Sequence, residues 1–334
     1  MIREIGSEFH KEVAQKGNGL VFPLQGVFTF SGRTALEIVL KKIPEAKKAL
    51  LPSYCCDSMI EPFIKTGIEL DYYPVYYENG LKVDLKIPED IDVLVWCNYF
   101  GFRLTMPDIS EFVKKGGIII EDITHSFFSP HPYHQQSHYY VASLRKWEPI
   151  VCGGFCASVN GDLLDTQLKP PPKEFVDLKI TAMKMKADYL LKPDAAKKAQ
   201  FLSMFDKSNR WIRNNYSGLS IDSGSMKYLD CVDMIKQKKT RVRNARILYK
   251  GLKKVQFLFP EKDMVCPLFV PIVLPNRDEV RSVLINNNIY CPIHWPKPKN
   301  CESNLYDHEL SIICDQRYNE DDMERIISVL QEIL

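Results

Sequence analysis

Short apolar runs alternate with amphipathic stretches through the first 160 residues, and this alternation constrains the fold more than any other feature. Residues 91–100 (IDVLVWCNYF) and 117–122 (GIIIED) are almost continuously apolar, which is typical of parallel strands buried on both faces. Between them, residues 106–117 (MPDISEFVKKGG) have the pattern of a helix that ends at glycine. Strands that alternate with helices predict an α/β fold with a mostly parallel sheet.

The same alternation extends to both sides of this segment. Ser31 precedes TALEIVLKKI, whose apolar residues fall on one face of a helix. The sequence also predicts a short strand that ends at Pro52, a helix at 58–67 and strands at 71–77, 138–143 and 153–159. We therefore expect a large, mostly parallel sheet.

After Asn160 the sequence no longer alternates between strand-like and helical patterns. Residues 174–214 are polar and helix-rich, with an interruption at Pro193, and residues 225–254 have one long helical pattern. On that pattern, Ile235, Val242, Tyr249 and Leu252 form one apolar stripe. We expect this stripe to pack against the rest of the protein.

A smaller α+β pattern completes the chain. It comprises a strand within 265–275, a helix at 277–287, a strand at 310–315 and a terminal helix within 319–334 that Asn319 is expected to cap. We predict two domains: a large α/β domain at residues 1–225 and a small α+β domain at 226–334.

The charge balance bears on partners and location. The chain has 44 Lys+Arg against 42 Asp+Glu, so its net charge creates no field for nucleic acid or an anionic membrane. Residues 236–254 hold nine Lys/Arg and no acid, which we interpret as the solvated face of a helix. The first residues lack the apolar core of a signal peptide, and no apolar run approaches the roughly 18 residues of a spanning helix. We expect a cytoplasmic protein that binds neither nucleic acid nor membrane.

The cysteine and histidine spacings do not predict a metal site. The ten cysteines include no CxxC pair, and many lie in apolar runs where a thiol acts as a small apolar side chain. Three further histidines follow His125 up to His138, but Pro130 and Pro132 break any helix there. We expect free thiols, no metal, and a mobile loop between Asp122 and Lys146.

Three segments carry groups that suit ligand chemistry. The first is the Ser-Gly-Arg-Thr turn at residues 31–34, which opens a predicted helix. Main-chain N–H groups at a helix start, with an arginine and hydroxyl groups nearby, suit a phosphate group. A capped helix with a surface arginine would have the same pattern.

The other two segments follow predicted strands. In IIIEDITH (118–125), a buried strand ends at Glu121 and Asp122, and His125 follows three residues later. Open α/β sheets bind ligands at the carboxyl ends of their strands, although an acid there also suits a turn cap. In SLRK (143–146), Lys146 follows a strand-like run and two glycines come shortly after. The alternative for Lys146 is a solvated surface lysine.

Taken together, these segments resemble the DegT/DnrJ/StrS family of sugar aminotransferases, which are fold-type-I enzymes dependent on pyridoxal 5'-phosphate (PLP). The resemblance implies a sheet of the seven-stranded type in the large domain. The resemblance extends through nearly the whole chain and includes seven short motifs in the family's order. These are SGRTALEIVL (31–40), LPSYCCDSM (51–59), NYFG (98–101), IIIEDITHS (118–126), SLRKW with the later GG (143–154), IHWP (293–296) and QRYNEDDMERI (316–326).

The resemblance implies a role for each matching residue. Lys146 corresponds to the lysine that forms a Schiff base with PLP. Asp122 corresponds to the carboxylate that pairs with the pyridine nitrogen, which lets the ring accept electrons from a breaking substrate C–H bond. His125 corresponds to the residue that contacts the ring and its phenolic oxygen.

The remaining matching residues correspond to those that contact the phosphate and the ring of the cofactor. The resemblance places the phosphate at Gly32, Arg33 and Thr34, with Ser143 as a further ligand. Ring stacking falls to Tyr54 or to another residue. The family's usual Gly-x-Asn-x-Arg loop, which reaches a partner subunit, has no clear match in residues 218–226.

The function that the resemblance implies is transfer of an amino group, with glutamate as the expected donor, to a nucleotide-linked keto-sugar. A PLP enzyme of the same fold with another outcome, such as dehydration or transfer to a non-sugar ketone, is one alternative. A non-catalytic regulator that kept the fold is another. We also expect a homodimer, in which Trp211, Ile212 and Tyr216 of an irregular helical region supply apolar contact to the partner.

Overall fold

The computed structural model describes residues 4–13, 16–129, 134 and 136–334. The chain divides into two compact units. The first unit comprises Met1–Ser7, Glu45–Ser137 and Ile235–Leu334, and the second comprises Glu8–Pro44 and His138–Met234. Both units are discontinuous in sequence, whereas the predicted division has one boundary near residue 225. That division stays a prediction.

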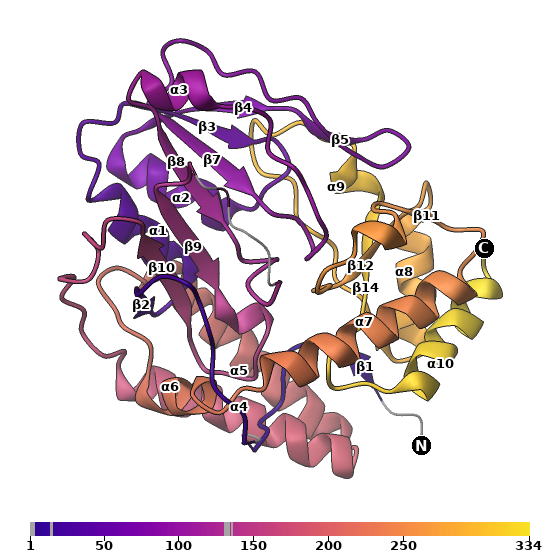
Figure 1. The fold of residues 1–334 in the computed structure, drawn as a ribbon. Coiled ribbons are helices and arrows are strands. Elements are labelled where there is room, and N and C mark those ends of the chain that lie inside the picture. Colours follow the sequence, from indigo (N-terminus) through magenta and orange to yellow (C-terminus); the bar gives the residue numbers. More distant parts are fainter. Residues whose placement is uncertain (1–3, 14–15, 130–133, 135) are drawn as a thin grey trace. The chain divides into compact units, whose positions relative to one another are not determined.

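Four parallel strands form the sheet of the first unit. Their order is β8 (Ile118–Asp122), β7 (Val93–Cys97), β3 (Lys48–Pro52) and β4 (Glu69–Tyr73) (Figure 1). Helix α2 (Asp57–Thr66) connects β3 to β4, and α3 (Ser110–Lys114) connects β7 to β8. All five residues of β7 are buried, as its continuous apolar run predicts.

The first unit also contains a small antiparallel sheet. Strands β11 (Gln256–Phe257), β12 (Val270–Val273) and β14 (Glu309–Ile312) lie beside α7 (Met234–Gly251), α8 (Arg277–Asn286) and α10 (Glu320–Gln331) (Figure 1). Their apolar side chains share one core that includes Leu248, Ile272, Ile312 and Ile326. Shorter elements complete the unit: η2 (Glu261–Asp263), α9 (Leu305–His308), the pair β1 (Ile5–Gly6) and β13 (Ile289–Tyr290), and the hairpin β5 (Val75–Tyr77) with β6 (Leu81–Val83).

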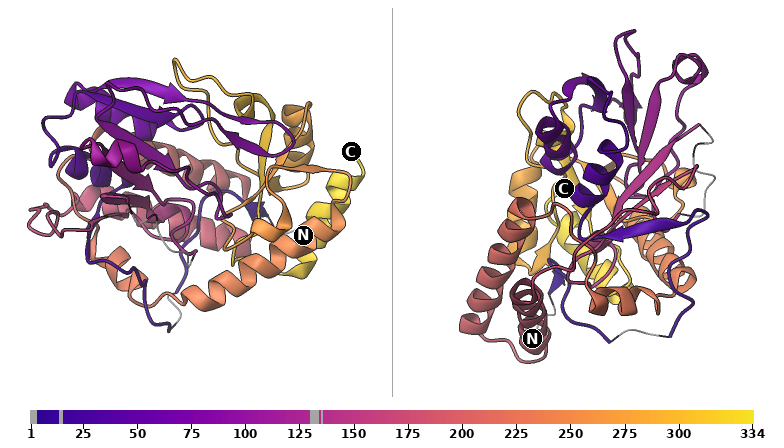
Figure 2. Two further views of the ribbon diagram at one scale, coloured as in Figure 1. Left: turned by 45° about the horizontal axis from the view of Figure 1, so that its top comes forward. Right: turned by 90° about the vertical axis from the view of Figure 1, so that its left-hand side faces the viewer.

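The second unit combines three strands with four helices in its described residues. Strand β10 (Gly154–Ser158) pairs antiparallel with β2 (Gly26–Thr29) on one side and β9 (Tyr139–Ser143) on the other. A single 3-10 turn, η1 (Leu144–Lys146), follows β9 directly. Helix α1 (Gly32–Leu40) packs against β9 and β10, and α6 (Ser223–Leu229) follows the long pair α4 (Lys173–Leu191) and α5 (Ala195–Asn214). Helices α4 and α5 lie side by side in all views (Figures 1 and 2).

The predicted α/β class is confirmed. The four parallel strands of the first unit and the three strands of the second make seven; the sequence pattern predicted six of them and missed β2. Helix capping follows the predictions as well, because Ser31 caps α1 and Asn319 forms a capping box with Asp322 at the start of α10. None of the described helices is long and apolar enough to cross a bilayer.

The predicted single helix over 225–254 is wrong. Helix α6 ends at Leu229 and α7 begins at Met234. The predicted stripe is partly right: Leu252 is buried in the core of the first unit and Tyr249 packs against that core. Ile235, however, is 65 % exposed, and the buried side of α7 includes Arg241 and Asn244. These polar side chains are buried because their N–H groups donate to main-chain carbonyls of neighbouring segments, those of Pro267, Leu268, Cys314, Asp315 and Tyr318.

The helical region of the second unit, expected to be irregular, takes part in a core together with residues outside it. Helices α4 and α5 enclose a cluster of buried aromatic and aliphatic side chains: Phe30, Phe175, Phe201, Phe205, Ile212 and Tyr216. Ile212 and Tyr216 are at most 2 % exposed within one chain. They are therefore not available for the partner contact that the sequence pattern suggested.

Candidate active site

The turn predicted to bind phosphate, residues 31–34, forms the amino-terminal cap of α1 in the second unit. The Ser31 hydroxyl accepts a hydrogen bond from the main-chain N–H of Thr34 (3.3 Å). The Thr34 hydroxyl donates to the carbonyl oxygen of Tyr216 (2.8 Å), so it holds the cap in place. The N–H groups of Gly32 and Arg33 have no acceptor within the helix, and such a helix start suits an anion.

Two glycines allow this turn to approach the strands. A Cβ atom on Gly154 would lie 2.3 Å from the main chain of Ser31, so a larger residue would push β10 away from the cap. A Cβ atom on Gly32 would lie 3.2 Å from Cβ of Ser143, which places the helix start directly beside the end of β9. The structure therefore brings the predicted phosphate turn and Ser143 together.

Lys146 lies three residues beyond Ser143, at the end of η1. Two buried side chains, Leu144 and Trp147, anchor this turn, and the Leu144 N–H donates to the carbonyl oxygen of Gly153 (3.1 Å). Lys146 itself is half-buried. The second unit thus presents a lysine on a short, anchored turn that follows the strand beside the α1 cap.

Arg145 is a further candidate that the sequence reasoning missed. Its Nε atom is buried and has no hydrogen-bond partner among the described residues. Burial lowers the pKa of Arg145, the Glu8 carboxylate partly offsets this effect, and the nearby Arg33 adds to the lowering. The Arg33 and Arg145 guanidinium groups therefore influence each other, and the Glu8 carboxylate is a counter-charge to Arg145. The sequence signal was the second cation in SLRK, next to the predicted lysine.

In the first unit, the two acidic residues at the end of β8, Glu121 and Asp122, have different surroundings. Glu121 is 2 % exposed, and its carboxylate accepts hydrogen bonds from the Asn98 amide (2.6 Å) and the Ser137 hydroxyl (2.8 Å). Burial raises its pKa despite these bonds. Asp122 is half-buried and accepts from the Thr124 N–H (2.8 Å), which begins the turn toward His125. Because side chains alternate along a strand, Asp122 projects to the opposite face from Glu121.

His125 is buried and has a defined proton position. Its Nδ1 atom accepts a hydrogen bond from the Phe100 N–H (3.3 Å), so the neutral ring carries its proton on Nε2. Phe100 and Gly101 both have positive φ values, and a Cβ atom on Gly101 would lie 1.8 Å from the Cys266 carbonyl oxygen. The NYFG motif is thus the turn that orients His125.

Tyr54 is fully buried in the first unit. Its ring lies 5.7 Å from that of Tyr99, 5.1 Å from that of Trp295 and 5.2 Å from that of Tyr306. Burial and the nearby Glu309 carboxylate raise its pKa well above the ordinary value. In this structure the contacts of Tyr54 are with other aromatic rings, and stacking on a cofactor stays a prediction.

The predicted site residues therefore fall into two groups. Gly32, Arg33, Thr34, Ser143 and Lys146 gather at one end of the strands in the second unit, and Tyr54, Asp122 and His125 belong to the first unit. The segment 218–226, which lacks the family's asparagine loop, contains the start of α6. Asp222 caps this helix and contacts the Cys152 thiol. The loop predicted between Asp122 and Lys146 lies partly outside the described residues, at 130–133 and 135.

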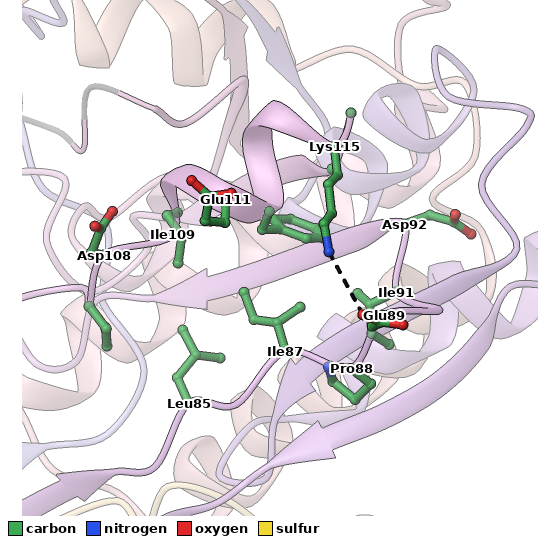
Figure 3. Close-up of a pocket in the computed structure, with 14 residues that line it drawn as sticks. Leu85, Ile87, Pro88, Glu89, Ile91, Asp92, Asp108, Ile109, Glu111 and Lys115 are labelled. Carbon is green, nitrogen blue, oxygen red and sulfur yellow. Dashed lines mark ion pairs between the residues drawn. The ribbon is translucent and has the colours of Figure 1, made fainter.

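A cavity of about 400 Å³ lies elsewhere in the first unit, between α3 and the segment before β7 (Figure 3). In the described part of the chain, none of the predicted site residues lines it. Glu89, Asp92, Asp108 and Glu111 contribute carboxylates, and Lys115 pairs with Glu89 at 3.9 Å. Because the charged side chains of this lining are mostly acidic, it does not suit the phosphate of a cofactor.

No protein-family model matches the sequence, and no curated protein matches it. The fold, however, is similar to many solved structures. One is the sugar aminotransferase CalS13 from Micromonospora echinospora, with a TM-score of 0.64 and 13% identity over 92% of this chain and 87% of that chain. A DegT/DnrJ/EryC1/StrS aminotransferase from Brucella abortus has a TM-score of 0.62 and 16% identity over 92% and 86% of the two chains.

A third similar structure is DesI in the presence of its TDP-sugar product. Its TM-score is 0.62 and its identity 12%, over 92% of this chain and 80% of that chain. At these identities the similarity concerns the fold. The resemblance predicted from the sequence motifs is confirmed at this level: the chain has the fold of the DegT/DnrJ/EryC1/StrS-type sugar aminotransferases.

Proposed function

We propose that the protein is a PLP-dependent aminotransferase that passes an amino group from glutamate to a nucleotide-linked keto-sugar. The observation that supports this best is the arrangement in the second unit. There the start of α1 lies against Ser143, and Lys146 follows on the next turn. The similar fold of CalS13 and DesI supports the same assignment.

The residues of the second unit fit the phosphate of PLP. The main-chain N–H groups at the start of α1, the Ser143 hydroxyl and the Arg33 guanidinium are all donors to an anion. The buried Nε of Arg145, which has no hydrogen-bond partner in the described structure, is a further donor in this unit. We assign the phosphate to this group of donors.

When bound, PLP supplies an electron sink for the breaking of a substrate C–H bond. Lys146 would hold the cofactor through its Nζ atom, and the same amine would move a proton once an amino donor has released it. The Asp122 carboxylate would keep the proton on the ring nitrogen. His125, whose Nε2 carries a proton, would donate a hydrogen bond to the ring oxygen.

The substrate class is a second part of the proposal. DesI has been solved with its TDP-sugar product, and CalS13 is a sugar aminotransferase. A nucleotide-linked keto-sugar is therefore the acceptor we infer for this chain. A PLP enzyme of the same fold with a dehydratase outcome or a non-sugar ketone as acceptor is the alternative, and a non-catalytic regulator is the alternative from another class.

Borohydride reduction tests the cofactor assignment. The full chain is incubated with PLP and reduced, and peptide mass spectrometry locates the covalent adduct. We expect it on Lys146, and we expect Lys146→Ala to lose it. Lys169→Ala removes an exposed lysine of the same unit and should leave the adduct unchanged. An adduct on another lysine, or none, would refute the assignment.

A substrate panel tests the reaction. The PLP-loaded protein is offered UDP-, GDP- and dTDP-linked keto-sugars with glutamate, and release of 2-oxoglutarate is measured. Release that depends on one of the sugars supports the aminotransferase. Loss of water from the sugar without 2-oxoglutarate would indicate the dehydratase. Release with simple ketones alone would indicate a non-sugar acceptor, and a protein that binds no PLP would indicate the regulator.

A further inference from the structure

A buried chain of hydrogen bonds joins Glu309, Ser311 and His294 in the first unit. Glu309 and Ser311 lie two residues apart on β14, so their side chains share one face of that strand. The Ser311 hydroxyl contacts Oε1 of Glu309 and lies 2.7 Å from Nδ1 of His294. Oε2 of Glu309 accepts the main-chain N–H of His294 (2.9 Å). All three residues are buried, Glu309 and Ser311 completely.

Counting protons shows that this series of hydrogen bonds has two states, which differ in whether Glu309 holds a proton. If Glu309 is ionised, the Ser311 hydroxyl donates to it, and Nδ1–H of His294 donates to Ser311. Nε2 of the neutral His294 ring then carries no proton and can only accept a hydrogen bond. If Glu309 is protonated, it donates to Ser311, and Ser311 donates to Nδ1. The neutral ring then carries its proton on Nε2. One proton taken up from solvent at Glu309 therefore reverses the hydrogen-bonding role of Nε2.

The His294 ring contacts His125. The two ring centroids lie 5.3 Å apart, nearly perpendicular, and the neighbouring Trp295 ring lies 5.5 Å from that of His125. Nδ1 of His125 is already occupied by the Phe100 N–H. The proton on Nε2 of His125 is therefore the one that a change at His294 can influence.

Several groups face Glu309 and set its titration. From α8, the Arg277 guanidinium donates to the Glu309 carbonyl oxygen (3.3 Å), and its charge favours the ionised form. Ser311, the His294 N–H and the Tyr54 hydroxyl favour the ionised form as well, and the buried Cys291 thiol is also close. Burial opposes all of them and raises the pKa of Glu309 to about 8. Glu309 can therefore be either protonated or ionised near neutral pH.

We propose that Glu309, acting through Ser311, is a positioning residue that selects the ring tautomer of His294 and thereby the hydrogen bonding of His125. The catalytic consequence rests on the proposed function, in which His125 contacts the cofactor ring. The hydrogen bonds between Glu309, Ser311 and His294 involve only protein groups, so they can be tested without the cofactor.

The direct test follows the His294 ring nitrogens by NMR. The full chain is labelled with 15N-histidine, and His294 signals are assigned by their loss in His294→Gln. As the pH rises through about 8, we expect Nε2 to change from the protonated to the unprotonated signal. Because this measurement uses the unaltered chain, it does not depend on any variant folding. A His294 tautomer that stays constant through this range would overturn the proposal.

Two variants test whether the hydrogen bonds that join Glu309, Ser311 and His294 cause the change of tautomer. Glu309→Gln keeps the shape of the side chain but does not titrate, so His294 should keep one tautomer at every pH. Ser311→Ala leaves Glu309 in place but breaks the link, and it should also abolish the change. Ser282→Ala, at an exposed serine on α8, should behave as the unaltered chain. An unchanged titration in Glu309→Gln would overturn the role of Glu309.

A second readout uses the PLP-loaded protein. If His125 contacts the ring, the pH at which the cofactor absorbance changes should shift in Glu309→Gln and in Ser311→Ala but not in Ser282→Ala. An absorbance titration that is the same in all three would remove the link to His125. Failure of the borohydride experiment on Lys146 would refute the aminotransferase instead, and it would leave the NMR titration of His294 unaffected.

Discussion

Gly154 of β10 lies so close to Ser31, the cap of α1, that a Cβ atom at position 154 would be 2.3 Å from the Ser31 carbonyl carbon and oxygen. Main-chain atoms cannot move aside cheaply, unlike the end of a flexible side chain. The close approach keeps the α1 cap beside the strand that precedes Lys146. The glycine is therefore part of the proposed phosphate site, although it has no side chain.

The first prediction concerns this contact. Gly154→Ala should destabilise the protein by about 1–3 kcal/mol, as for overpacking in a filled core, and should weaken PLP retention. Gly153→Ala is a matched control, because its Cβ would meet the end of the Ile150 side chain (2.5 Å), which can move. Urea unfolding and PLP titration compare the two variants. Equal effects would show that the Ser31 contact is not the cause.

The second prediction concerns Asp122. Asp122→Asn should retain PLP but lower turnover by orders of magnitude, because an amide does not stabilise a protonated ring nitrogen as a carboxylate does. Asp84→Asn, at an exposed acid of the same unit, serves as the control. Turnover is measured with the active sugar substrate. Turnover of Asp122→Asn within a few-fold of the unaltered protein would contradict the assigned role.

The third prediction concerns the phosphate donors. Arg33→Ala should weaken PLP binding by roughly 1.5–3 kcal/mol, the contribution of a hydrogen bond to a charged group. Arg213→Ala, at an exposed arginine on α5, should leave the affinity unchanged. Equilibrium dialysis of PLP measures both affinities. If Arg33→Ala binds PLP as tightly as its control, the phosphate lies elsewhere.

The fourth prediction concerns stability and pH. The pKa of Glu309 is about 8 in the folded chain, against an ordinary value of 4.5. Between these values the folded chain holds a proton that the unfolded chain has released. The free energy of unfolding should therefore fall as the pH rises from 4.5 to 8, with at most about 1.4 kcal/mol per pH unit from this group.

Glu309→Gln removes this titration, so its unfolding free energy should fall less steeply over the same range. Urea unfolding at several pH values measures both slopes. The comparison between the two proteins isolates Glu309 from other titrating groups, including the buried Glu121, whose pKa is also raised. Identical slopes would mean that Glu309 does not hold a proton in the folded chain.

The fifth prediction concerns assembly. On the basis of the family resemblance we expect a homodimer, and sedimentation equilibrium at micromolar concentration should give twice the 38.6 kDa mass of the chain. The contact must use surfaces other than Ile212 and Tyr216, which the core of the second unit buries. A single-chain mass in a fully active protein would contradict this prediction.

The sequence by itself determined the features that depend on neighbours along the chain. A helix cap forms between residues three apart, so Ser31 and Asn319 were recognisable without the fold. A buried strand is a continuous apolar run, which is why the ends of β8 and β9, and with them Asp122 and Lys146, could be located. Their order along the chain was sufficient to indicate the fold class.

The tertiary structure alone decided which polar groups are buried together. Arg241 and Asn244 face the core of the first unit because carbonyl groups more than 20 residues away accept their hydrogen bonds, and the apolar pattern of this helix did not indicate that they are buried. His294 meets Ser311 only because β14 lies beside the loop that holds it. The free energy of a buried polar group depends on partners that are distant in sequence, and no local pattern records those partners.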